Sequence, residues 1–282
     1  MCDICGKGNS KLVHKGTRDN RNIDVYECDF CHTKFLGEIK ENDYKNGFMN
    51  GIHRMTPQQI QNRLNACKKD DERRAIALKK YCKDKRILDF GCGFGGYLDL
   101  IKEVTPDIFG VEVGDSETEY LKSKNFNIKT DINEYSEPFD VITLFHVLEH
   151  LPEPQKWLDT FAKHLKSGGL LFLEVPNGND ALLNLYKSDK FADFTYWSAH
   201  LYLYTVKSLK LLIKQNGQYK IEKAEQVQRY PLSNHLYWIK EGKPEGHKKL
   251  TYLNNKLINT FYTKFLSAAN MCDTLFFILR KI

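Results

Sequence analysis

Residues 85–98, which read KRILDFGCGFGGYL, decide the fold of this chain. The apolar side chains within 87–90 predict a buried strand of a parallel sheet, and the apolar spacing of 97–101 predicts a helix. The glycines between them let the backbone approach a ligand closely and direct the first N–H groups of the helix at it. The stretch therefore predicts a small-molecule site at the carboxyl end of a strand.

Two kinds of ligand are compatible with these glycines. Gly91, Gly93 and Gly96 satisfy the dinucleotide pattern G-x-G-x-x-G, which leaves an NAD-dependent sugar oxidoreductase as an alternative. Asp89 instead favours a cationic ligand, because a carboxylate beside the turn repels a pyrophosphate. The stretch closely resembles the first motif, Asp-x-Gly-x-Gly-x-Gly, of class I S-adenosylmethionine-dependent methyltransferases. The resemblance implies that this cofactor is bound by Asp89, Gly91, Gly93 and Gly95.

Later phrases repeat the resemblance in the order of the same family. The strand predicted at 139–145 leads into 147–151 (VLEHL), which resembles the fourth motif, and the strand predicted at 170–175 ends in Val-Pro-Asn, as in that family. Strands and helices alternate over 85–227, the predicted S-adenosylmethionine-binding core, as in a doubly wound parallel sheet. The predicted fold class is α/β: a Rossmann-like, doubly wound, seven-stranded sheet whose last strand, at 272–282, is antiparallel.

Other residues of the core are expected to contact the cofactor. Glu112 lies at the carboxyl end of a strand predicted at 108–113, 21 residues after Gly91. A carboxylate there can accept the ribose hydroxyls of a bound nucleoside. The resemblance implies further contacts from Asp131 (to the adenine amino group, with a solvated loop aspartate as the alternative), Ile132 (through its backbone), and Phe145 and His146 (to the methionine arm).

The N-terminal residues 1–45 carry paired cysteines, Cys2-x-x-Cys5 and Cys28-x-x-Cys31. Two such pairs can supply four thiolates tetrahedrally to Zn²⁺, and four ligands close a site and make it structural. The region is too small for a core of its own, so we expect the metal to supply its folding energy. A redox pair and chance spacing are the alternatives.

A helical connector is expected at 46–84, starting at Thr56-Pro57. Its mixed-charge run, 68–74, is typical of a solvated helix face. In the resembling family a helix in this position often covers the cofactor. The helix before the fifth strand is expected to end at 166–169, where two glycines occur.

The acceptor site is expected in the long segment before the helix predicted at 206–215, because such long loops are usually functional. Tyr196 and Trp197 precede His200 there, and aromatic rings beside a histidine suit a sugar. His200 is the candidate general base, because its unperturbed pKa lies near neutral pH. A core histidine, or substrate binding without proton transfer, is the alternative.

Glu149 and His150 follow the fourth strand and are further catalytic candidates. They either touch the substrate or fix the turn before Pro152. A divalent ion is a third possibility, for which the sequence offers two candidate ligands and no third.

A paired-cysteine module ahead of this fold resembles bacterial sugar methyltransferases that act on nucleotide sugars or on capsule and lipopolysaccharide precursors. Their C-methylating members carry a Tyr-His-Glu-His-like phrase in this loop, whereas residues 197–200 read WSAH. Ala199 replaces the glutamate, so O-methylation of a sugar hydroxyl is the leading prediction. A sugar carbon, a phosphate-derived group, another small metabolite and RNA remain as alternative acceptors.

Residues 228–271 form an insertion before the last strand and are expected to line the acceptor pocket, unless they are a surface excursion. Arg229 is placed to meet a phosphate. The other candidate substrate-binding residues of the insertion are Asn234, His235 and His247.

Composition and charge bound the expected partners, and the modest positive charge favours an anionic substrate. The 282 residues carry a formal net charge of +6, without a basic stretch interleaved with aromatics, so nucleic acid is not the expected partner. The most apolar late segment, 261–279, contains charged residues, so no membrane span is expected. Eight cysteines without a leader predict a reducing cytoplasm.

Overall fold

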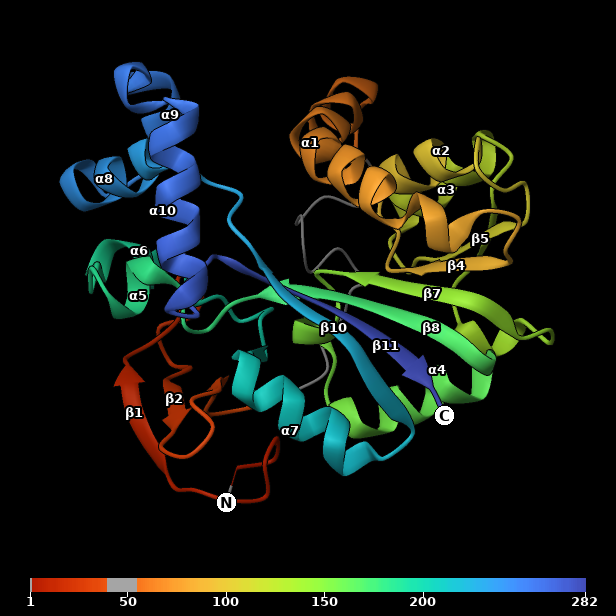
Figure 1. Cartoon of the computed structure of the whole chain (residues 1–282), viewed down its shortest axis with the longest axis horizontal. Coiled ribbons are helices and arrows are strands. Elements are labelled where there is room, and N and C mark those ends of the chain that lie inside the picture. Colours follow the sequence, from red (N-terminus) through yellow and green to blue (C-terminus); the bar gives the residue numbers. More distant parts are fainter. Residues whose placement is uncertain (1, 40–54) are drawn as a thin grey trace.

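A computed structural model describes residues 2–39 and 55–282, with a seven-stranded sheet at its centre (Figure 1). The strand order is β10-β11-β8-β7-β4-β5-β6. Neighbours from β8 to β6 are parallel, and β11 is antiparallel to both β8 and β10. The predicted fold class is therefore confirmed. The strands are β4 (Ile87–Phe90), β5 (Ile108–Val111), β6 (Asn127–Lys129), β7 (Phe139–Phe145), β8 (Leu165–Pro176), β10 (Tyr219–Val227) and β11 (Thr274–Lys281).

Helices cover both faces of this sheet. Figure 1 shows α1 (Pro57–Cys82), α2 (Gly96–Ile101) and α3 (Asp115–Ser123) on one side, and α4 (Pro154–His164) and α7 (Val206–Asn216) on the other. The remaining helices are α5 (Ala181–Asn184), α6 (Asp189–Thr195), α8 (Leu232–Glu241), α9 (Gly246–Lys249), α10 (Lys256–Ala268), and the 3₁₀ turns η1 (Ile132–Glu134), η2 (Leu148–His150) and η3 (Thr251–Leu253). None of the helices in the described ranges is both long and apolar enough to cross a bilayer.

The strand order reverses at β4. From β4 the chain continues through β5 and β6 on one side, then returns to β7 and β8 on the other. In such sheets, ligands bind in the crevice outside the carboxyl ends of the strands at this switch point. The glycine turn after β4 and the η2 turn after β7 therefore meet at the edge where a ligand is expected.

The N-terminal residues form a second, antiparallel sheet, β1-β2-β3-β9. Its strands β1 (Ser10–His14), β2 (Val25–Cys28) and β3 (Lys34–Leu36) come from the cysteine module, but β9 (Tyr202–Leu203) comes from the long segment of the core. Module and core share one continuous apolar cluster. The side chains of Thr205 and Gln215 donate to the carbonyls of Cys31 and Cys5, at 2.8 Å each. The module thus uses the core domain to complete its sheet.

The connector helix α1 begins as its sequence predicts. Thr56 Oγ1 accepts from Gln59 N at 3.3 Å, and Gln59 Oε1 accepts from Thr56 N at 2.8 Å, which forms a capping box ahead of Pro57. Residues 40–54, which include parts of the expected module and connector, lie outside the described residues.

The expected end of the helix before the fifth strand is wrong. α4 ends at His164, and Leu165 already pairs with Phe139 as the first residue of β8. The pairing becomes irregular between Phe139 and Val141, so the two glycines at 168–169 lie within the strand. Gly168 and Gly169 therefore accompany an irregularity in strand β8 and do not end the preceding helix.

Candidate active site

The glycine turn after β4 has the backbone that its sequence predicts. Gly91, Gly93 and Gly95 all have positive φ angles, of 74°, 53° and 73°. A Cβ at Gly91 would lie 2.5 Å from Val147, and one at Gly95 would lie 2.5 Å from Leu121, so neighbouring elements close against these two positions. A Cβ at Gly93 would meet no atom of the described residues within 4 Å. The turn therefore opens at Gly93 and is closed on both sides of it.

Glu112 lies beside this open position. Its Oε2 accepts from Gly93 N at 2.8 Å, while Oε1 accepts from Val113 N and Gly114 N at 2.8 and 2.9 Å. Three backbone donors thus fix the carboxylate at the end of β5, next to the turn.

Asp89 is buried beneath the turn. It is 3% exposed and accepts from Thr143 Oγ1 at 2.6 Å. Burial raises the pKa of Asp89 to about 7, against the effect of this hydrogen bond. A cationic ligand in the turn would favour the ionised form of Asp89.

The two residues expected to contact adenine, Asp131 and Ile132, lie at the start of the 3₁₀ turn η1. Asp131 is exposed and accepts from Asn133 N at 2.9 Å, whereas the side chain of Ile132 is buried. η1 therefore follows β6 at the same sheet edge, with the carboxylate of Asp131 bonded within its own turn.

An ion-pair network that the sequence analysis missed connects α1 to the sheet. Glu174, near the end of β8, is fully buried and accepts from Arg74 Nη2 at 2.7 Å and from Arg73 Nη2 at 2.9 Å. Arg74 also donates to Asp71 at 3.0 Å. Burial of Glu174 is outweighed by His146 and Arg74, which hold its pKa well below the usual range.

The prediction that 68–74 is a solvated face is therefore wrong in part, because Asp71 and Arg74 face the sheet. The helical spacing of the sequence could have indicated this burial. One side of α1 is buried, and it carries residues three or four positions apart: Asp71, Arg74, Leu78 and Cys82.

His146 follows β7 with φ = 57°, a left-handed backbone that non-glycine residues rarely adopt. Its Nε2 lies 3.3 Å from Glu174 Oε1, and its Nδ1 lies 3.4 Å from Glu149 Oε1. Burial opposes protonation, but these two carboxylates raise the pKa of His146. The ring of Phe145, one residue earlier, packs on Tyr97 with 4.9 Å between centroids.

Glu149, His150 and His200 come together, although the last two lie 50 residues apart. One ligand atom from each lies within 4.8 Å of those of the others. The side chain of Glu149 is fully buried, whereas both histidines are partly exposed. Burial and then the charge of His150 lower the pKa of His200 to about 3. Its ring is neutral at physiological pH and is a weak base when it acts alone.

The loop that carries His200 is held by the cysteine module. Asp19 Oδ1 accepts from Ser198 N at 3.0 Å, and Arg18 N donates to the carbonyl of Tyr196 at 2.8 Å. Trp197 lies with the catalytic candidates, since its ring centroid is 5.3 Å from that of His200. Tyr196 points elsewhere: it is 5% exposed and packs on His14.

The candidates from the insertion do not converge on this cluster. Arg229 Nη1 lies 3.2 Å from Asp70 Oδ2 and 3.3 Å from His146 Nε2, so it joins the ion-pair network. Asn234 is buried and accepts from Glu245 N. Buried His235 lies 2.6 Å from Tyr262 OH through Nδ1, and burial lowers its pKa to about 4. His247 lies in the exposed helix α9.

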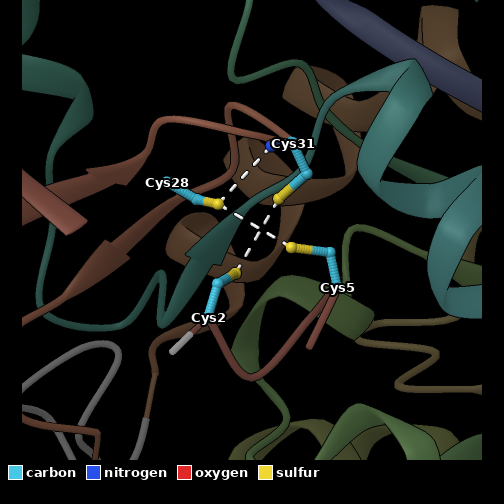
Figure 2. Close-up of side chains that lie close together, drawn as sticks. All are labelled: Cys2, Cys5, Cys28 and Cys31. Atoms are coloured by element: carbon cyan, nitrogen blue, oxygen red, sulfur yellow. Dashed lines mark hydrogen bonds between the residues drawn. The ribbon is translucent and has the colours of Figure 1, made fainter. Parts of the chain in front are cut away.

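The four module cysteines form a compact buried cluster (Figure 2). The sulfur of Cys2 lies 3.8 Å from that of Cys31, and the sulfur of Cys5 lies 3.7 Å from that of Cys28. Tetrahedral Zn²⁺ with bonds of about 2.3 Å places its sulfur ligands about 3.8 Å apart. These residues therefore fit a zinc ion.

Strand order, the antiparallel β11 and the glycine turn beside Glu112 together define the Rossmann-like methyltransferase fold. The chain belongs to the methyltransferase domain family, whose sequence profile matches residues 57–223, more than half of its length.

Similar proteins agree with this assignment. Ubiquinone biosynthesis O-methyltransferase of Saccharophagus degradans is 29% identical over 120 residues, covering 39% of this chain and 48% of the relative. The enzyme of that name from Coxiella burnetii is 30% identical over 107 residues, covering 34% and 46%. The chain thus matches about half the length of these curated relatives. The structure of the plantazolicin methyltransferase BpumL shares the fold, with a TM-score of 0.50, 16% identity, and coverage of 79% of this chain and 89% of that one.

Proposed function

We propose that this chain transfers the methyl group of S-adenosylmethionine to a hydroxyl oxygen of a small-molecule acceptor. The observation that carries the proposal is the open glycine turn, where Gly93 N–H is bonded to the carboxylate of Glu112 at 2.8 Å. Two comparisons support it. The curated relatives are O-methyltransferases by name, and the BpumL structure contains S-adenosylhomocysteine.

The cofactor would supply an activated methyl group, so the protein has to hold this donor and prepare the acceptor. Glu112 uses three of its roughly four acceptor positions on backbone N–H groups, which leaves about one for a ribose hydroxyl. Asp89 beneath the turn favours the positive charge of the donor. The remaining proposed contacts are Asp131 and Ile132 to adenine, and Phe145 and His146 to the methionine arm.

Acceptor activation is assigned to Glu149, His150 and His200 as a group. A hydroxyl has to lose its proton as the oxygen attacks the methyl carbon, and the low pKa of His200 makes it insufficient alone. Trp197 lies beside both histidine rings, and the guanidinium of Arg18 lies 4.2 Å from the centroid of its indole ring. Aromatic side chains with a few polar groups are typical of the lining of a small-molecule site. We therefore propose a sugar hydroxyl, on a nucleotide sugar or surface-polysaccharide precursor, as the acceptor.

A second acceptor class follows from the relatives, which are named for ubiquinone biosynthesis. Purified protein should be incubated with S-adenosylmethionine and, separately, with nucleotide sugars, polysaccharide precursors and phenolic quinone precursors. Methyl uptake is read by mass. Uptake by sugars alone supports the proposed acceptor, and uptake by phenols alone contradicts it while leaving O-methylation in place.

Calorimetry tests the cofactor assignment separately. We expect binding of S-adenosylhomocysteine and none of NAD⁺. Binding of NAD⁺ alone would refute the whole proposal and favour an oxidoreductase.

We further propose that Cys2, Cys5, Cys28 and Cys31 bind one structural zinc ion. Cys28→Ser should lose that zinc and lower the melting temperature. Because the module holds the loop of His200, the variant should also lose methyl transfer. Cys67→Ser, at an exposed cysteine of α1, is the matched control and should keep both. Wild-type protein without bound zinc would contradict this assignment.

A further inference from the structure

The cluster of Glu149, His150 and His200 contains polar atoms that lack partners. Both carboxylate oxygens of Glu149 and Nδ1 of His200 are buried without a hydrogen-bond partner in the described part of the chain. A buried carboxylate without hydrogen-bond donors is unfavourable, because its charge has lost its contacts with water and has gained none from the protein. His146 Nδ1 lies 3.4 Å from Glu149 Oε1, which is an ion-pair distance without hydrogen-bond geometry.

The orientation of His150 is consistent with a ligand role. Its Nδ1 lies 2.8 Å from the carbonyl of Ala199, so this nitrogen carries the hydrogen and Nε2 carries the lone pair. A hydrogen bond of this kind is the usual second contact of a histidine that binds a metal, because it fixes the tautomer and the ring. Ala199 is the neighbour of His200, so the same loop positions both rings.

We propose that Glu149, His150 and His200 bind a divalent transition-metal ion that in turn binds the acceptor hydroxyl. Two imidazoles and a carboxylate are donors that suit Zn²⁺, Mn²⁺ or Fe²⁺ better than Mg²⁺, which prefers oxygen ligands. Bonds of about 2.1 Å bring such ligands to roughly 3–3.5 Å of one another. The ligand atoms here lie within 4.8 Å of one another, so side-chain rotations that bring them about 1–2 Å closer would complete the site.

This inference rests on the proposed O-methylation and names its activating group. With three protein ligands, the ion keeps an open position for the acceptor oxygen and lowers the pKa of that hydroxyl. The proton passes to water, and the oxygen attacks the methyl carbon. The C–S bond breaks with its electron pair staying on sulfur, which gives the methyl ether, neutral S-adenosylhomocysteine and one proton.

The site lies next to the proposed cofactor turn. Val147, two residues before Glu149, closes against Gly91, so η2 and the glycine turn are in contact at the carboxyl edge of the sheet. An acceptor oxygen bound at the cluster is therefore on the side of the sheet where the methyl donor is expected.

Metal binding can be measured without knowing the acceptor. Protein purified with zinc in its cysteine site is passed over a chelating resin and titrated with Mn²⁺, with free Mn²⁺ followed by electron paramagnetic resonance. We expect one Mn²⁺ per wild-type chain and at least tenfold weaker binding in His200→Ala and in Glu149→Gln. His164→Ala is the control, because His164 lies in α4 with Nδ1 near the carbonyl of Thr160, and it should bind Mn²⁺ as wild type does.

Binding of S-adenosylhomocysteine is measured on each variant to show that it is folded. Loss of Mn²⁺ with retained S-adenosylhomocysteine binding supports the site. If the wild type takes up neither Mn²⁺ nor Zn²⁺ beyond the cysteine site, or if both ligand variants bind like the wild type, the site is refuted while O-methylation stands. Wild-type protein that binds Mn²⁺ but not S-adenosylhomocysteine would instead refute the proposed function.

Discussion

Replacing Arg74 by methionine tests whether the ion-pair network holds α1 on the sheet. The substitution keeps the apolar stem but removes the charge that contacts Glu174 at 2.7 Å and Asp71 at 3.0 Å. Breaking a buried ion pair costs about 3–5 kcal/mol, because the remaining charge stays buried. Arg73 still donates to Glu174, so we expect the lower end, a loss of about 3 kcal/mol in the free energy of unfolding.

Urea unfolding provides the measurement. With a denaturant slope of about 3 kcal/mol per molar, the midpoint should fall by about 1 M. The matched control is Lys68→Met on the same helix, where Lys68 and Glu72 are both exposed and 3.9 Å apart, so the change should stay within about 0.5 kcal/mol. α1 packs on α2, the helix that follows the glycine turn, so Arg74→Met should also weaken binding of S-adenosylhomocysteine. A loss below about 1 kcal/mol would show that Arg73 alone suffices and would refute the reasoning.

Three further predictions follow from single sites. Glu112→Ala should weaken binding of S-adenosylhomocysteine by about tenfold or more in calorimetry, which is the value of one charged hydrogen bond. The control Asp99→Asn, at an exposed residue of α2, should leave the affinity unchanged, and equal affinities of the two variants would remove Glu112 from the cofactor site. Gly95→Ala and Gly168→Ala both place a side chain at φ near 72°, but among the residues that the structure describes only the Cβ at Gly95 meets a neighbour, Leu121. Gly95→Ala should therefore cost about 1–3 kcal/mol more than Gly168→Ala in urea unfolding, and equal losses would contradict the close approach. Burial, followed by the nearby carboxylate of Asp273, raises the pKa of Asp180 to about 8. The folded state then holds a proton that the unfolded state releases, so this group should lower the free energy of unfolding by up to ~1.4 kcal/mol for each unit that the pH rises between about pH 4 and 8. Asp180→Asn should remove this contribution from unfolding curves measured from pH 5 to 9, and an unchanged slope would refute the assignment.

Some features were predictable because they depend on residues close in sequence. The strand, glycine turn and helix of residues 87–101 follow from apolar spacing and from backbone angles that glycine adopts at low cost. The start of α1 at Pro57 follows from a capping box within four residues. Other features were not predictable, because their energy comes from contacts across the fold. Arg74 lies in a run whose charges looked solvated, and only the buried carboxylate of Glu174 explains its burial.

The sequence by itself determined the class of fold, the glycine turn with its acidic partner, and four cysteines spaced for a metal. Only the tertiary structure decided that β9 completes the sheet of the cysteine module, that Arg229 belongs to an ion-pair network, and that His200 joins Glu149 and His150. The physical reason is range. Backbone preferences and apolar periodicity act within about one turn or strand and can be read along the chain. Residues 50 positions apart, such as His150 and His200, meet only because the folded sheet brings the loops at its carboxyl edge together.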